Sequence, residues 1–182
     1  MADAEGIVFA GQRFGLDAAT VLIGPDDPGG FSFARAATPE ATLGTDREGQ
    51  VQRAILRASW THDAAAAFRV QVGRIPASSA HFIIDFDGTI YQTADLADAL
   101  LSEREEPRRS VEIVLVGKID NLLKRPDRPM FPPTHRRAAE MAKHPRQRSG
   151  IKAINGHRSQ SWGYTDAQYR ALGSLLRRLQ AL

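Results

Sequence analysis

Residues 80–93, AHFIIDFDGTIYQT, constrain the fold of this chain most strongly. Two runs of β-forming residues flank the dipeptide Asp87-Gly88, which tolerates the positive φ angles of a tight hairpin turn. Residues 111–117, VEIVLVG, form a short apolar run rich in β-branched side chains, which is typical of a strand covered on both faces. The sequence therefore predicts a β-hairpin at 80–93 and a strand in the centre of a sheet at 111–117.

Further strand and helix signals lie on both sides of these segments. Residues 51–60, VQRAILRASW, predict a strand with a buried middle, and the Ala-rich residues 61–73 predict a helix that begins at Thr61 or His62. Thr165 and Gln168 form a capping box, and the apolar residues that follow recur at helical spacing. We therefore expect an amphipathic helix over residues 166–180 and a chain that mixes strands with helices.

The length and composition restrict the class of protein. A chain of 182 residues suits one domain, and 42% apolar with 25% charged residues is the composition of a soluble globular protein. No stretch reaches the roughly 18–20 uninterrupted apolar residues of a membrane span. Two acids stand near the N-terminus, where a secretory signal would be basic. We expect no signal peptide, and a cytoplasmic or particle-associated location. The absence of cysteine excludes disulfides and thiolate chemistry.

Two segments predict irregular structure. Residues 1–50, with GPDDPGG at 24–30, predict an extended N-terminal arm, which leaves residues 51–182 as the domain proper. Residues from about 118 to 150 predict a basic, Pro-rich insertion that is mostly exposed loop. The cations that this insertion offers to a partner are Arg125, Arg128, Arg136, Arg137, Lys143, Arg146 and Arg148.

The basic insertion raises the question of nucleic-acid binding, because clustered cations contact phosphates. Only Phe131 interrupts the cations, so the segment lacks a platform on which bases could stack. An acidic protein or an anionic envelope polymer fits the charge equally well, and a solvated loop fits it better than either. We therefore do not expect nucleic acid as the partner.

The histidines and acids offer few candidate catalytic groups. His62 follows a predicted strand, where it either projects as a metal ligand or lies exposed in the first turn of the helix. We expect His81 to be packed and hydrogen-bonded in the core, and His157, in INGHRS, to lie in a turn. Glu112 interrupts an apolar strand, so it must be partnered, be neutral or face a cavity. A salt-bridged or strand-edge Glu112 is favoured over a role in a site.

Three segments together indicate a family. SSAHFIIDFDGTIYQTADLADA at 78–99, SVEIVLVG at 110–117 and GYTDAQYRALGSLLRRL at 163–179 resemble the zinc-dependent N-acetylmuramoyl-L-alanine amidase and peptidoglycan-recognition family. The resemblance spans about residues 51–180. It implies an α/β fold with a mixed central β-sheet and flanking helices. It also implies a bacterial cell-wall role and a groove in which active members cleave the lactyl-amide bond between muramic acid and the stem peptide. Trp60, His81 and Tyr91 would belong to this groove or its scaffold.

The catalytic positions of the family are changed in this sequence. Active members carry a zinc-binding His in a His-Tyr-Thr-like triplet, and the matching triplet here is Ser59-Trp60-Thr61, which places Ser59 at the ligand position. The general-base Glu of the family matches Val114. Glu112 lies two positions earlier, on the same face of the strand but about 7 Å along it.

The remaining two zinc ligands of the family follow the C-terminal helix. This sequence ends at Leu182, directly after that helix, and Gly156-His157 precedes it. A hydrolytic zinc site needs three protein ligands and a water. The resemblance therefore implies a degenerate, C-terminally shortened member that holds no zinc.

Three functions compete on this basis. The first, which we favour, is a pseudoenzyme without a cofactor. It either binds peptidoglycan or a muropeptide or serves as a structural subunit of a larger assembly, such as a phage-tail-like or injection particle. The second is an active amidase whose zinc ligands are drawn from His62, His157 and a carboxylate such as Glu112 or Asp63. The third is nucleic-acid binding through the basic insertion.

Overall fold

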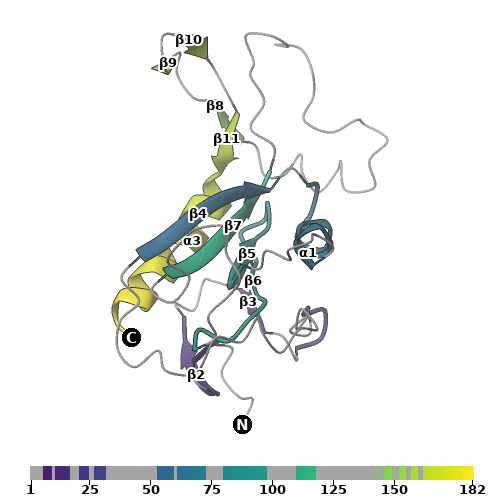
Figure 1. Ribbon diagram of the computed structural model, residues 1–182, viewed down its shortest axis with the longest axis vertical. Helices are drawn as coiled ribbons and strands as arrows, with labels where there is room; N and C mark the ends of the chain where they lie inside the picture. Colours follow the sequence, from purple (N-terminus) through teal and green to yellow (C-terminus); the bar gives the residue numbers. More distant parts are fainter. Residues whose placement is uncertain are drawn as a thin grey trace.

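The computed structural model is shown in Figure 1, where most of the strands and helices carry labels that number them in chain order. The structure describes residues 6–9, 11–16, 21–24, 27–31, 53–59, 61–72, 80–97, 110–117, 143, 146–148, 152–154, 157–159 and 162–182.

A five-stranded sheet forms the centre of the fold, with the strand order β3-β6-β5-β7-β4. Its strands are β3 (Leu22–Ile23), β4 (Arg53–Ser59), β5 (Phe82–Ile84), β6 (Ile90–Gln92) and β7 (Ser110–Val116). β7 pairs in parallel with both β4 and β5, β3 is parallel to β6, and only β5 and β6 run antiparallel. The predicted mixed α/β fold is confirmed at this level of detail.

Two helices cover opposite faces of the sheet. Side chains alternate between the faces of a strand, so Val111, Ile113 and Leu115 of β7 pack with α3 (Asp166–Gln180). Val114 and Val116 point the other way and pack with α1 (Ala64–Val72). In Figure 1, α3 (yellow) runs behind β4 and β7, and α1 lies to the right of β5. β7 is buried along its whole length, as the sequence predicts for a strand covered on both faces.

Several local predictions hold, and two need correction. The β5–β6 hairpin forms around Gly88, whose φ of 88° is the left-handed value, but residues 85–89 connect the strands, so the turn is wider than a two-residue one. The capping box of Thr165 and Gln168 starts α3. The prediction that α1 begins at Thr61 or His62 is wrong, because Asp63 accepts the Ala66 N–H at 2.7 Å and caps the helix.

The prediction of a buried middle for β4 is also wrong. β4 pairs with β7 on one side and is the last strand in the order of the sheet. Leu56, at the middle of the strand, is 49% exposed. The apolar residues of β4 therefore reflect strand propensity more than burial.

The N-terminal residues are not an irregular arm where the structure describes them. β1 (Gly6–Phe9) and β2 (Gln12–Gly15) form an antiparallel hairpin, and β3 adds an edge to the central sheet. Ile7 and Leu22 are buried in the core on the α3 face. The prediction of an extended arm over residues 1–50 is wrong at these strands, and residues 32–50 lie outside the described ranges.

Gln92 links the β1–β2 hairpin to the sheet. Its side chain is fully buried, its Oε1 accepts the Val8 N–H at 2.8 Å, and its Nε2 donates to the carbonyls of Val8 and Ala94, each at 2.8 Å. The amide therefore pairs with β1 as a backbone peptide group would. A second link, from the Gly11 N–H to Asp95 Oδ2 at 2.9 Å, is exposed to solvent.

We predict that Gln92→Leu lowers the free energy of unfolding by about 2 kcal/mol, because the Val8 N–H and the Ala94 carbonyl lose a buried partner. Urea denaturation of the full chain, followed by circular dichroism, measures the change. Asp95→Ala removes the exposed link to Gly11 and the hydrogen bond from the Ala97 N–H at 2.8 Å, both of which a solvent-accessible carboxylate makes, and should cost no more than about 1 kcal/mol. Equal losses in the two variants would contradict the role given to Gln92.

Short antiparallel pairs precede α3. β8 (Arg146–Arg148) pairs with β11 (Trp162–Thr165), and β9 (Lys152–Ile154) pairs with β10 (His157–Ser159). The end of the basic insertion is therefore a strand and not a loop. The rest of the insertion, apart from Lys143, lies outside the described residues. Within the described part of the chain, no helix is long and apolar enough to cross a membrane.

Candidate functional site

The parallel strands β4, β5 and β7 end at the same edge of the sheet, which is where ligands bind in open α/β folds. Ser59 is the last residue of β4, at the position that the resemblance assigns to a zinc ligand. Its hydroxyl lies 2.7 Å from the hydroxyl of Thr61, and the two form a hydrogen bond. The Ser59 backbone carbonyl also accepts the Gly117 N–H at 3.2 Å. This edge therefore presents a pair of neutral hydroxyl groups.

Two buried carboxylates hold the start of α1, the helix that follows β4. Asp63 is 6% exposed and caps the helix through Ala66. Asp85 is 2% exposed, and its Oδ1 accepts the Phe86 N–H at 2.8 Å while Oδ2 accepts the Ala64 N–H at 3.4 Å. A negative charge is stabilised at the positive end of a helix, which explains why both acids are buried there. Asp63, one of the two carboxylates that the sequence offers as zinc ligands, is thus the N-cap of α1.

Glu112 is buried in an ion pair. Its side chain is 2% exposed, and Oε2 accepts a hydrogen bond from Nη2 of Arg57, which is 26% exposed. Arg57 lies opposite Val114 in the parallel register, so it shares the α1 face with Glu112. Oε1 of Glu112 has no hydrogen-bond partner among the described residues. Glu112 is therefore the salt-bridged residue that the sequence favours.

His81 joins the same cluster from the start of β5. It is fully buried, its backbone N–H donates to the Glu112 carbonyl at 2.8 Å, and its ring Nδ1 accepts a hydrogen bond from the Glu112 backbone N–H at 3.1 Å. Because Nδ1 accepts a hydrogen bond, it carries no proton, and the proton of the neutral ring resides on Nε2. His81 is therefore a core residue that continues the pairing between β5 and β7.

The other candidate site residues from the sequence analysis lie in separate parts of the structure. Val114 is 4% exposed and lies in the apolar cluster under α1. Tyr91 is half-buried on the same face, 4.9 Å from Phe31 between ring centroids. His62 is exposed before α1, whereas His157 opens β10 in a separate two-stranded sheet. Trp60 lies outside the described residues.

Three of the seven basic residues of the predicted partner surface lie among the described residues, and four do not. Lys143 is exposed, and the backbones of Arg146 and Arg148 belong to β8. The remaining four lie outside the described ranges: Arg125, Arg128, Arg136 and Arg137.

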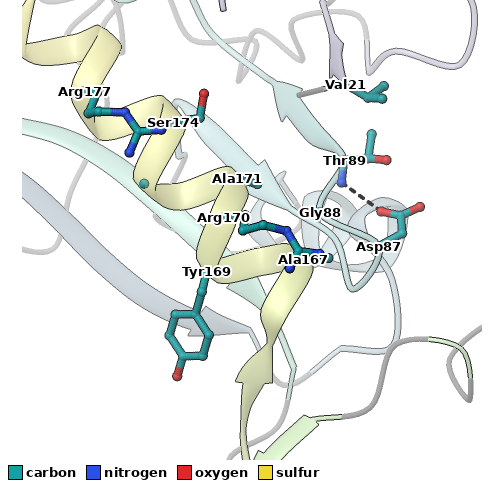
Figure 2. Close-up of a pocket in the computed structure, with 11 residues that line it drawn as sticks. Val21, Asp87, Gly88, Thr89, Ala167, Tyr169, Arg170, Ala171, Ser174 and Arg177 are labelled. Atoms are coloured by element: carbon teal, nitrogen blue, oxygen red, sulfur yellow. Dashed lines mark hydrogen bonds between the residues drawn. The ribbon is translucent and has the colours of Figure 1, made fainter. Parts of the chain in front are cut away.

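A cavity of about 390 Å³ lies between α3, the β5–β6 turn and the residue before β3, and we call it the α3 cavity. Figure 2 shows Arg170 and Arg177 extending from α3 along one wall, with Asp87 and Thr89 on the facing wall. No pattern in the sequence predicts this cavity, because its walls come from three segments far apart in the chain: Val21, residues 87–89 and residues 167–177. The mid-helix Gly173 is the one local signal, since glycine costs a helix interior about 1 kcal/mol relative to alanine.

The fold and these sites define a mixed α/β domain with a hydroxyl pair at one edge of the sheet and a charged cavity on its α3 face. Among the residues that the structure describes, no three His, Cys, Asp or Glu side chains are grouped so that they could hold a metal ion. Comparison of the chain with protein-family models, with curated proteins and with solved structures finds no match.

Proposed function

We propose that this chain is a non-catalytic amidase-like domain that binds a fragment of peptidoglycan at the carboxyl ends of β4 and β7. One observation carries the proposal. Where the resemblance places a zinc ligand and a general base, the chain has the hydrogen-bonded Ser59–Thr61 hydroxyl pair and the buried, apolar Val114.

The chemistry of these groups supports binding over hydrolysis. A neutral serine hydroxyl is a poor zinc ligand compared with the imidazole, thiolate and carboxylate groups that bind zinc in proteins. The side chain of Val114 cannot accept a proton from a water molecule. Glu112, the nearest acid in the strand, is paired with Arg57. Hydroxyl groups at a sheet edge can instead donate hydrogen bonds to, and accept them from, the amides and hydroxyls of a muropeptide.

Cosedimentation with insoluble peptidoglycan and calorimetric titration with soluble muropeptides test the proposal. We expect the purified chain to cosediment and to release no stem peptide, with or without added zinc, as measured by mass spectrometry of the supernatant. Release of stem peptide on zinc addition would establish the active-amidase alternative. A chain that does not bind the polymer would contradict the binding role and leave the assembly-subunit alternative.

Two matched variants locate the binding surface. Ser59→Trp places a large side chain at the carboxyl end of β4 and should weaken binding at least about tenfold, or 1.4 kcal/mol. Ala54→Trp adds the same side chain at the exposed opposite end of the strand and should leave binding unchanged. Thermal unfolding of both variants checks that they fold. Equal binding by the two would place the ligand elsewhere.

A further inference from the structure

The α3 cavity carries charges of both signs on facing walls. Arg170 and Arg177 are exposed residues of α3 and stand seven positions apart, which is two helical turns or about 10 Å along the axis. Ser174 lies between them and lines the same wall. On the facing wall, Asp87 Oδ1 accepts the Thr89 N–H at 2.9 Å, which orients the carboxylate (Figure 2).

Two glycines give the cavity its shape. At Gly88, an added Cβ would lie 2.8 Å from the backbone oxygen of Ala167, so only glycine allows the β5–β6 turn to approach α3 this closely. At Gly173, the missing side chain leaves space beside Arg177. The resulting volume of about 390 Å³ falls in the range of roughly 300–1,000 Å³ that is typical of small-molecule sites.

The charges restrict the ligand. A simple anion such as phosphate would be attracted by the arginines but repelled by Asp87. A simple cation would be attracted by Asp87 but repelled by the arginines. A ligand with a carboxylate at one end and an ammonium at the other satisfies both walls. We propose that the α3 cavity binds the zwitterionic backbone of a short peptide, with the peptide carboxylate on Arg170 and Arg177 and its ammonium group on Asp87.

Calorimetric titration of the full chain with L-alanyl-L-alanine tests this proposal. We expect saturable binding of the free dipeptide. The N-acetylated dipeptide and the C-amidated dipeptide should each bind about tenfold more weakly than the free one, because each modification removes one charge contact. Asp87→Asn should abolish the discrimination against the acetylated form. The double variant Arg170→Gln and Arg177→Gln should abolish the discrimination against the amide.

A matched pair at Gly173 tests whether the cavity itself is the site. The Cβ of Gly173→Ala would lie 3.6 Å from Nη1 of Arg177, which is ordinary contact, so this variant should bind as the wild type does. Gly173→Leu fills the space and should lose the dipeptide. Thermal unfolding of both variants confirms that α3 is intact.

Three results would overturn the proposal: no saturable binding of the dipeptide, equal affinity for the free and the modified dipeptides, or equally tight binding of inorganic phosphate. The site does not depend on peptidoglycan binding at the sheet edge, because α3 covers the opposite face of the sheet from Arg57 and Ser59. Ser59→Trp should therefore leave dipeptide binding unchanged. Loss of dipeptide binding in this variant would also count against the α3 cavity.

Discussion

Gln168→Ala should lower the free energy of unfolding by about 4 kcal/mol, because several buried groups lose their partners at once. The side chain is fully buried, and its Oε1 accepts the Thr165 N–H at 3.0 Å. Its Nε2 donates to the Ile84 carbonyl at 3.3 Å and to the Val116 carbonyl at 2.8 Å. One amide thus joins the start of α3 to the ends of β5 and β7.

Urea denaturation of the full chain measures this loss, and two variants show its origin. Gln168→Met keeps most of the side-chain volume but makes none of the three hydrogen bonds, so it should lose nearly as much stability as the alanine variant. Gln180→Ala changes an exposed glutamine at the end of the same helix and should cost less than about 0.5 kcal/mol. Wild-type stability in Gln168→Met would show that packing, and not hydrogen bonding, makes this residue important.

Arg57→Met should cost about 3 kcal/mol at neutral pH, because it leaves the Glu112 carboxylate buried without a counter-charge. Glu112→Leu should cost less, since Arg57 is 26% exposed and its guanidinium can reach water. The double variant should recover most of the stability, because an apolar pair replaces the buried ion pair.

A double-mutant cycle of the four proteins, measured by urea denaturation, gives the coupling between the two side chains. Arg53→Met serves as the control, because it removes an exposed arginine from the start of the same strand. Additive losses in the single and double variants would contradict a buried ion pair in the folded chain.

The sequence predicts the parts of the fold that short-range patterns control. The positive φ of Gly88, the apolar run of β7 and the capping box of α3 each lie within a few neighbouring residues. The N-terminal strands escaped prediction because they are only two to four residues long. The β1–β2 hairpin joins the sheet partly through the side chain of Gln92, and no local pattern shows such a contact.

The candidate sites depend on registers between distant segments. Glu112 in a buried strand requires a partner, but its identity as Arg57 follows from the parallel register of β4 and β7, which are fifty-five residues apart at this pair. Likewise, the approach of Gly88 to Ala167 forms the α3 cavity only after α3 has packed. The hydroxyl pair at Ser59 and Thr61 is the exception, because these residues are neighbours in the sequence.

The position of β7 also determines when this domain can fold. β4 and β5 are made first, yet in the described sheet each of them pairs with β7, which lies between them. During synthesis the earlier half of the sheet is therefore incomplete until residues 110–116 have emerged from the ribosome. Such long-range pairing raises the contact order, which slows folding and prolongs the exposure of unpaired strand edges. The nascent chain is most vulnerable to aggregation in this interval.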